Sequence, residues 1–414
     1  MSVAAPPAQG FAERLLPEVR VFMDVQQYES GAADRHFLAS YRGRLRTESH
    51  EAYQRLEPIF ARAGSTILLR QEGETQILLA VEELKARKPG NPVVNVLLFL
   101  ATFATVLYLG VNYAQTYLEA TPVARGIPLI GKPLPLALLY AGSLLGILVA
   151  HEFGHYLMGR YHKTAVSLPY FIPFPGGLFG TFGAFIQLRS PPKNRRILMD
   201  IGLAGPLAGL VIAVPVLLIG LLLSEVSPIP SQLGPLSGGS LLEGNSLLYL
   251  GAKFLVTGKL LPQPVSYQGV APLVYWLRNL VFGVSRPLGV PVPLGGLDVQ
   301  LHPMAWAGWA GFLVTGLNLI PTGQLDGGHV LYSLLGKRAR VLWPVIIAGL
   351  IGLTLVWNGW LLFVALTFLM GRNYAQPLDD VTPLDARRRG LAIFGLVLFF
   401  LIFTPVPIVP LIGR

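Results

Sequence analysis

The sequence predicts a mainly α-helical polytopic membrane protein with about six to seven spans, a small N-terminal α+β soluble domain and a re-entrant β-hairpin near its main polar motif. The first supporting observation is composition, since 52% of residues are apolar and only 13% are charged. Soluble globular chains carry about 25% charged residues. The second is a series of apolar runs close to the roughly 20 residues that cross hydrocarbon. The third is that residues 20–90 break this pattern, with charges spread throughout.

The N-terminal 90 residues divide into two parts. We expect a flexible N-terminus at 1–19 and a soluble α+β domain at 20–90. The expected elements of this domain are a strand at 37–45, a helix at 52–63 and a hairpin that joins 66–69 to 77–81 around Gly73.

A membrane core is expected at 91–375, followed by a C-terminal loop and last span at 376–414. The expected spans are 92–112, 134–158, 197–223, 303–320, 341–357, 359–371 and 390–409, of which the sixth is short. The long segment 224–300 lies between spans three and four. It is rich in Pro, Gly and Leu, and apolar stretches at 245–257 and 270–283 predict interfacial helices.

The positions of the basic residues predict an orientation. With the N-terminal domain in the cytoplasm, the inside loops 159–196, 336–340 and 372–389 hold six, three and four Lys plus Arg. The outside segments 113–133 and 224–300 hold only two and four. Because basic residues favour the cytoplasmic side, this asymmetry also accounts for the net charge of +10. We therefore expect a lipid bilayer as a partner and no nucleic acid.

The main polar motif is His151-Glu152-Phe153-Gly154-His155, near the end of an apolar run that begins at about Leu134. On a helix, His151 and His155 share one face and can hold one zinc ion. Glu152 lies beside that position and could act as general base toward an attacking water molecule. Ionisable groups within an apolar span are costly and usually mark function, which disfavours a buried polar network without metal.

A third zinc ligand must come from elsewhere, because catalytic zinc normally has three protein ligands. The chain has no cysteine, and Asp326 is the only carboxylate between Asp298 and Asp379. Pro321 and Gly323 interrupt the helix before Asp326, as suits a hydrated cavity. An alternative is that Asp326 caps the next helix. His329 could compete as a ligand, although we expect it to lie next to the ligands without binding the metal itself.

These motifs resemble the site-2 protease family of intramembrane zinc metalloproteases. The resemblance rests on HEFGH in one span and NLIPTGQLDGG in a later one, with the small-residue segment 204–209 between them, and it covers roughly residues 92–375. The resemblance implies that His151, His155 and Asp326 bind zinc and that Glu152 is the general base. It also implies that Asn318 helps to position substrate. The N-terminal domain is similar to that of the subgroup found in plastids and photosynthetic bacteria.

Residues 171–188 are uncharged and contain four glycines. A protease that acts on a helical span must hold its substrate extended, and an exposed strand edge could do so by strand addition. We expect 180–188 to form that edge, with Gly180, Gly183 and Phe185 as substrate-binding residues. A hairpin that only plugs the mouth of the site is an equal alternative.

The expected function is hydrolysis of peptide bonds within or near the transmembrane segments of membrane-anchored protein substrates. A zinc transporter or sensor is one alternative, but it has no evident use for Glu152. An inactive relative that retains membrane proteins is another. The expected location is the bacterial cell (inner) membrane, with the N-terminal domain and the active site toward the cytoplasm.

Overall fold

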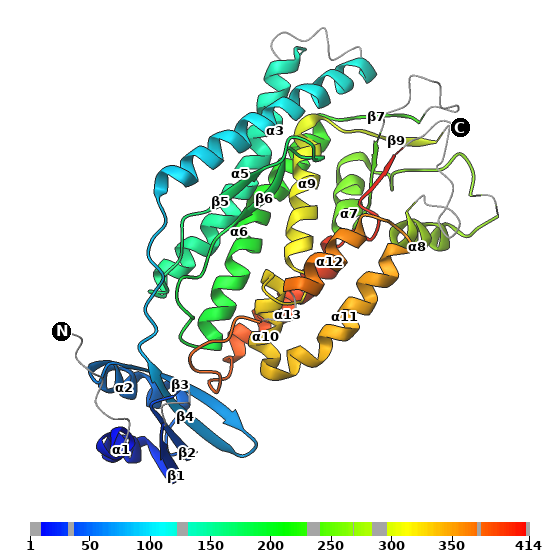
Figure 1. The fold of residues 1–414 in the computed structure, drawn as a ribbon. Coiled ribbons are helices and arrows are strands. Elements are labelled where there is room, and N and C mark those ends of the chain that lie inside the picture. The colour runs from blue at the N-terminus through cyan, green and yellow to red at the C-terminus, as the bar shows by residue number, and fades with distance from the viewer. Residues whose placement is uncertain are drawn as a thin grey trace.

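The computed structural model describes residues 10–31, 37–121, 131–229, 241–267, 269–283, 296–370 and 374–410. Figure 1 shows a body of helices with a small sheet domain at one end. Residues 1–9 of the expected flexible N-terminus, and parts of segment 224–300, lie outside the described residues.

The N-terminal domain is a four-stranded antiparallel sheet with two helices. The strand order is β1-β2-β4-β3. The strands are β1 (Met23–Ser30), β2 (Ala39–Leu45), β3 (Ser65–Glu72) and β4 (Thr75–Glu82), and the helices are α1 (Phe11–Phe22) and α2 (Ser49–Arg62). The predicted strand, helix and hairpin are therefore present, whereas α1 and β1 are additions.

Helix α1 corrects the prediction of a flexible N-terminus up to residue 19. Its residues Ala12, Leu15 and Val19 are buried. Their spacing of three and four residues places them on one helix face, which packs into the same apolar cluster as Tyr41 of β2. Burial of this face makes residues 11–19 part of the folded domain.

Three helices of the described chain are long and apolar enough to cross a membrane, namely α3 (Pro92–Ala120), α5 (Pro133–Tyr161) and α6 (Arg195–Leu222). Four shorter helices lie at the other predicted spans: α9 (Pro303–Asn318), α11 (Ala339–Thr354), α12 (Trp360–Met370) and α13 (Ala386–Ile402). The expected six to seven spans are therefore not confirmed as a count. One reason is that α9 stops before Pro321, whose ring and missing N–H break a helix.

Close helix packing places α6 at the centre of the body, in contact with α5, α9 and α10 (Asp326–Leu335). A Cβ on Gly308 of α9 would lie 2.6 Å from Cα of Leu217 on α6. A Cβ on Gly220 of α6 would lie 2.5 Å from Cα of Ala305 on α9. Small residues at these positions let the two backbones approach, as in other membrane helix pairs.

The predicted hairpin is formed by β5 (Tyr170–Pro173) and β6 (Thr181–Phe185), which pair antiparallel. It lies against α3, where the Asn95 side chain donates to the carbonyls of Leu168 and Pro169. The Thr105 hydroxyl of α3 donates to the carbonyl of Gly180 at 2.7 Å. Helix α3 therefore holds both ends of the hairpin.

The segment after α6 contains both expected short helices, α7 (Leu247–Thr257) and α8 (Pro272–Phe282). Two small antiparallel pairs accompany them. They join β7 (Glu225–Pro228) to β9 (Leu297–Gln300), and β8 (Leu241–Glu243) to β10 (Ile408–Pro410). The second pair fastens the C-terminal end of the chain to this segment.

Candidate active site

Helix α5 supplies the first three polar side chains of the site. His151, Glu152 and His155 are 2%, 3% and 5% exposed. The helix is continuous through the motif, so the two imidazoles share a face one turn apart. The sequence prediction of a helical HExxH motif within an apolar span-length helix is confirmed.

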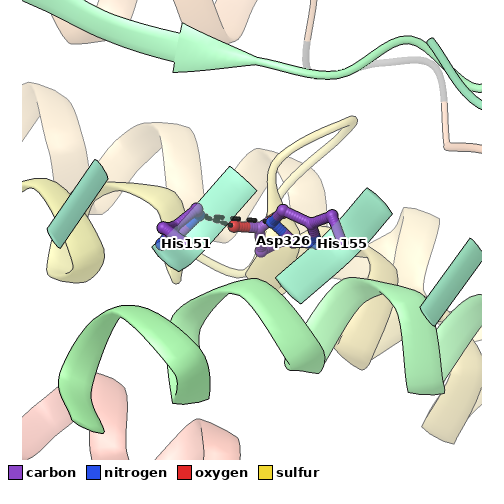
Figure 2. A group of neighbouring side chains, drawn as sticks. All are labelled: His151, His155 and Asp326. Atoms are coloured by element: carbon purple, nitrogen blue, oxygen red, sulfur yellow. Dashed lines mark hydrogen bonds and ion pairs between the residues drawn. The ribbon is translucent and has the colours of Figure 1, made fainter. Parts of the chain in front are cut away.

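Asp326 joins the histidines from a different part of the chain. Helix α9 ends at Asn318, and α10 begins at Asp326 itself. Oδ2 of Asp326 lies 3.2 Å from Nε2 of His151, and Oδ1 lies 3.2 Å from Nε2 of His155. Figure 2 shows the three side chains pointing toward one another. They are identified as a group that could hold a metal ion, with ligand atoms within 4.8 Å of one another.

Asp326 does not act as the N-cap of α10, which was the alternative role for this residue. Leu325 occupies the N-cap position of α10, and no side chain caps that end. Asp326 is the first helical residue, and its carboxylate faces the histidines. The irregular chain between the helices therefore delivers this carboxylate to α5.

The backbone of α6 orients one imidazole. Nδ1 of His155 donates to the carbonyl of Ile201 at 2.7 Å. With Nδ1 carrying the hydrogen, Nε2 presents its lone pair toward His151 and Asp326. This arrangement is the usual support for a metal-binding histidine. Sequence reasoning missed Ile201 because a backbone carbonyl leaves no signature in residue identity.

Glycines on α6 make room for the site. A Cβ on Gly205 would lie 2.0 Å from Nε2 of His155, and one on Gly209 would lie 3.2 Å from Nδ1 of His151. A Cβ on Gly202 would lie 2.7 Å from Cβ of His329. The small-residue segment 204–209, together with Gly202 before it, thus forms the surface against which these polar side chains pack.

Asn318 and His329 are polar neighbours of this group, but among the described residues only Asn318 contacts one of its side chains through a hydrogen bond. Nδ2 of Asn318 lies 3.3 Å from Nε2 of His151, so the structure brings this predicted residue to the site. His329 is not part of the metal-binding group within the described chain, and its Nδ1 is buried without a hydrogen-bond partner there. His329 therefore lies outside the group that could hold a metal ion.

The predicted substrate-binding residues lie in the hairpin. Gly180 and Gly183 have φ of +79° and +96°, a region that glycine enters without strain. The ring of Phe185 is 49% exposed and stacks on Tyr170. Among the described residues, the hydrogen bonds and ring contacts of Gly180, Gly183 and Phe185 stay within the hairpin and α3. The structure therefore shows a hairpin with an accessible aromatic side chain, and none of these hydrogen bonds or ring contacts reaches the histidines.

The donor set suits zinc. Two imidazole nitrogens and one carboxylate oxygen form a known catalytic zinc combination, which leaves a fourth position for water or substrate. The three donor side chains are mostly buried, and His155 already has the partner that such a ligand requires. Glu152 directly follows His151 in the sequence and is itself buried.

Comparison with known proteins decides the family. The profile of "Peptidase family M50" matches residues 139–356, a stretch that contains both polar motifs. The chain belongs to peptidase family M50. This is the site-2 protease family, so the resemblance found in the sequence is confirmed.

Curated relatives of this M50 chain are plant proteins. It is 31% identical over 285 residues to "Probable zinc metalloprotease EGY1, chloroplastic" of Arabidopsis thaliana, covering 67% of this chain and 44% of that protein. It is 28% identical over 333 residues to the rice (Oryza sativa subsp. japonica) protein of the same name, covering 76% and 50%. It is 25% identical over 388 residues to "Probable zinc metalloprotease EGY2, chloroplastic" of Arabidopsis thaliana, covering 92% and 61%.

These relatives match the expected plastid subgroup. Their names describe them as chloroplastic, so the expectation of a bacterial cell membrane finds no support in them. The M50 chain spans about half the length of the curated relatives it matches. No solved structure matches the chain significantly.

Proposed function

We propose that this M50 chain is an intramembrane zinc metalloprotease that hydrolyses peptide bonds within or near transmembrane segments of membrane-anchored proteins. The observation that carries the proposal is the meeting of His151, His155 and Asp326 beside Glu152, inside apolar helices. Family membership and the names of the relatives, which describe zinc metalloproteases, support the same chemistry. In this proposal the three residues hold zinc.

Each protein group then has a defined task. Zinc, when bound, would polarise the scissile carbonyl and make water a better nucleophile at neutral pH. Glu152 takes the proton from the attacking water and delivers it to the leaving amine. His155 is held in position by the Ile201 carbonyl, and Asp326 fixes the side of the site opposite α5. The apolar helices around these groups limit the access of bulk water.

The hairpin is the proposed substrate-holding element. A helical span hides its backbone carbonyls in its own hydrogen bonds, so it must be extended before cleavage. Among the described residues, strand β6 pairs only with β5, which leaves one edge of β6 without a strand partner. An extended substrate could add to that edge, with Phe182 and Phe185 as apolar contacts. Both rings are about half exposed.

Replacing Phe185 distinguishes a hairpin that holds substrate from a hairpin that only plugs the mouth of the site. Substitution of Gly183 by Pro is unsuitable, because φ of +96° at Gly183 is incompatible with the fixed φ of proline. For Phe185→Ala we expect a raised KM with zinc content unchanged if the edge holds substrate. A plug would instead give an unchanged or lowered KM. Phe254→Ala, which removes an exposed ring on α7, is the matched control.

The proposed orientation places the N-terminal domain and the active site toward the cytoplasm, or toward the corresponding compartment of an organelle. It rests on the excess of basic residues in loops 159–196, 336–340 and 372–389. Figure 1 shows the N-terminal domain at the end of the body where α10 and the start of α6 lie. This position supports placing the N-terminal domain and the active site toward the same side of the membrane. The orientation can be tested by introducing single cysteines and measuring their accessibility to labelling reagents on each side of the membrane. The chain has no cysteine of its own to interfere.

The function is tested with purified wild type and Glu152→Gln in detergent. Both are incubated with a panel of single-span substrates, and products are mapped by mass spectrometry. Cleavage inside the spans by wild type alone is the expected result. Cleavage by both proteins would remove Glu152 from the mechanism. Zinc in wild type without cleavage of any substrate, together with zinc flux in vesicles, would favour a transporter.

A further inference from the structure

A short segment of the C-terminal loop, residues 377–382, joins the N-terminal domain to the helices of the active site. We call it the strap. We propose that the strap makes the N-terminal domain a positioning element for the metal ligands, with Asp380 as the residue that transmits its position. The inference rests on the proposed function in its zinc and kcat readouts, whereas its hydrogen-exchange readout does not.

The first side of the strap completes the N-terminal sheet. Residues 378–380 pair in parallel with the free edge of β3, since the Leu69 N–H donates to the Leu378 carbonyl and the Asp380 N–H donates to the Leu69 carbonyl. The guanidinium of Arg70 donates to the carbonyls of Pro377 and Leu378, at 3.0 and 2.7 Å. Strand addition to an open edge is a standard mode of recognition.

Side chains reinforce this pairing. The hydroxyls of Ser49 on α2 and Thr382 lie 2.9 Å apart in a buried contact. Leu378 and Val381 pack against the apolar core of the N-terminal domain. The strap is therefore part of that domain in structure, although more than 300 residues separate it from β3 in the sequence.

The second side of the strap contacts the start of α6. The Leu378 and Asp379 N–H groups donate to the carbonyls of Pro192 and Lys193, at 3.0 and 2.8 Å. Arg195, at the first position of α6, donates to the Val381 carbonyl. Helix α6 is the one whose Ile201 carbonyl orients His155.

Asp380 connects the strap to the third ligand. Its carboxylate is buried and accepts a hydrogen bond from the Tyr332 hydroxyl at 3.2 Å. Tyr332 lies on α10, the helix that begins at Asp326. The same carboxylate lies 3.9 Å from Arg195 of α6. One buried carboxylate thus contacts the two helices that place Asp326 and orient His155.

Asp380 therefore couples the position of the strap to the positions of α6 and α10. The buried carboxylate of Asp380 accepts a hydrogen bond from Tyr332 on α10 and has Arg195 on α6 as its counter-ion at 3.9 Å, so it links the two helices as long as the strap is seated. Docking of the N-terminal domain seats the strap through Arg70 and Leu69. Loosening this contact lets α10 shift, and Asp326 shifts with it.

Two substitutions test the link. Arg70→Gln weakens the seating of the strap, and Tyr332→Phe removes only the hydroxyl that contacts Asp380. For each we expect zinc release to a chelator to rise and kcat to fall by about three- to tenfold, with KM nearly unchanged. The matched controls are Arg42→Gln and Tyr28→Phe, which change exposed side chains of β2 and β1, and both should behave as wild type.

A disulfide provides the rescue. The cysteine-free chain allows Ser49→Cys and Thr382→Cys to be introduced as the only thiols, at a position where the native hydroxyls are in contact. In the Arg70→Gln background, oxidation should restore zinc retention and kcat, and reduction should remove the restoration. Restoration separates a positioning role from simple misfolding.

Hydrogen exchange of the α10 backbone gives a readout that needs neither zinc nor cleavage. Faster exchange in Arg70→Gln, slowed again by the disulfide, is the expected result. Unchanged exchange, zinc release and kcat in Arg70→Gln would overturn the inference, as would a disulfide that restores none of them. A wild-type protein without zinc would contradict the proposed function instead, and the exchange result would still decide the link between strap and α10.

Discussion

A side chain on Gly205 cannot coexist with the observed position of His155. A Cβ built on Gly205 would lie 2.0 Å from Nε2 of His155, the atom that faces Asp326. Helix α6 therefore leaves room for the imidazole of His155 at the candidate zinc site. The glycine at this position is required by the place of that imidazole.

Gly205→Ala should therefore disturb the metal site directly. We expect the imidazole of His155 to be displaced and zinc affinity to fall by about 10- to 100-fold, as happens when a ligand loses its support. Competition with a chelator measures this affinity. The matched control is Gly142→Ala on α5, where an added Cβ meets nothing within 4 Å. Normal zinc affinity in Gly205→Ala would show that His155 is not a ligand in the observed geometry.

Glu152→Gln should separate metal binding from chemistry. The amide keeps the shape of the side chain but cannot accept the proton, so kcat should fall by about 100-fold or more. Zinc content should stay at the wild-type level because Glu152 is outside the ligand group. Kinetics on a cleaved single-span substrate, together with metal analysis, check both parts. Loss of zinc in this variant would make Glu152 a ligand or a structural support.

Asn318→Ala tests whether that residue serves substrate or metal. Its amide is 3.3 Å from Nε2 of His151, yet an amide nitrogen does not bind zinc, so we expect zinc to be retained. The expected kinetic effect is a raised KM or lowered kcat, since a donor near the scissile bond would be lost. Steady-state kinetics and metal content are measured on the same preparation. A drop in zinc with normal kinetics in the remaining loaded protein would assign Asn318 to the metal site alone.

Much of this site follows from sequence because its chemistry is local. The spacing of His151 and His155 fixes a shared helix face, and Asp326 stands out as a lone carboxylate near a helix break. Ile201 and the strap could not be predicted, since they act through backbone groups and through pairing across more than 300 residues. Helix α1 was missed although Ala12, Leu15 and Val19 show helical spacing, because a terminal segment with three prolines resembles a flexible tail. The span count is not confirmed, and one place where the structure differs from the expected spans is α9, which ends before Pro321.

A buried charge cluster in the segment after α6 predicts a pH effect on stability. Lys253 is fully buried, with Nζ 3.5 Å from Glu243 and 3.9 Å from Asp298. Burial raises the pKa of Asp298 from 3.8 to about 7, although Lys253 opposes the shift. Between these two values the folded chain binds a proton that the unfolded chain does not. The free energy of unfolding should therefore fall as pH rises from 3.8 to about 7 and show no further change from this group above that.

Thermal unfolding in detergent, followed by tryptophan fluorescence, checks this effect. Asp298→Asn mimics the protonated carboxyl and should flatten the dependence of Tm on pH in that range. Asp24→Asn, an exposed substitution on β1, should leave the wild-type slope in place. A slope in Asp298→Asn equal to that of wild type would show that Asp298 does not titrate in this range.

The most direct test of the central claim is the zinc-to-protein ratio of wild type and Asp326→Ala, purified side by side with Glu152→Gln. We predict about one zinc per chain in wild type and Glu152→Gln, and almost none in Asp326→Ala, because two histidines alone leave the site without its third protein ligand. A wild-type protein without zinc, or an Asp326→Ala protein that keeps its full zinc content, would contradict the metal centre on which the account depends.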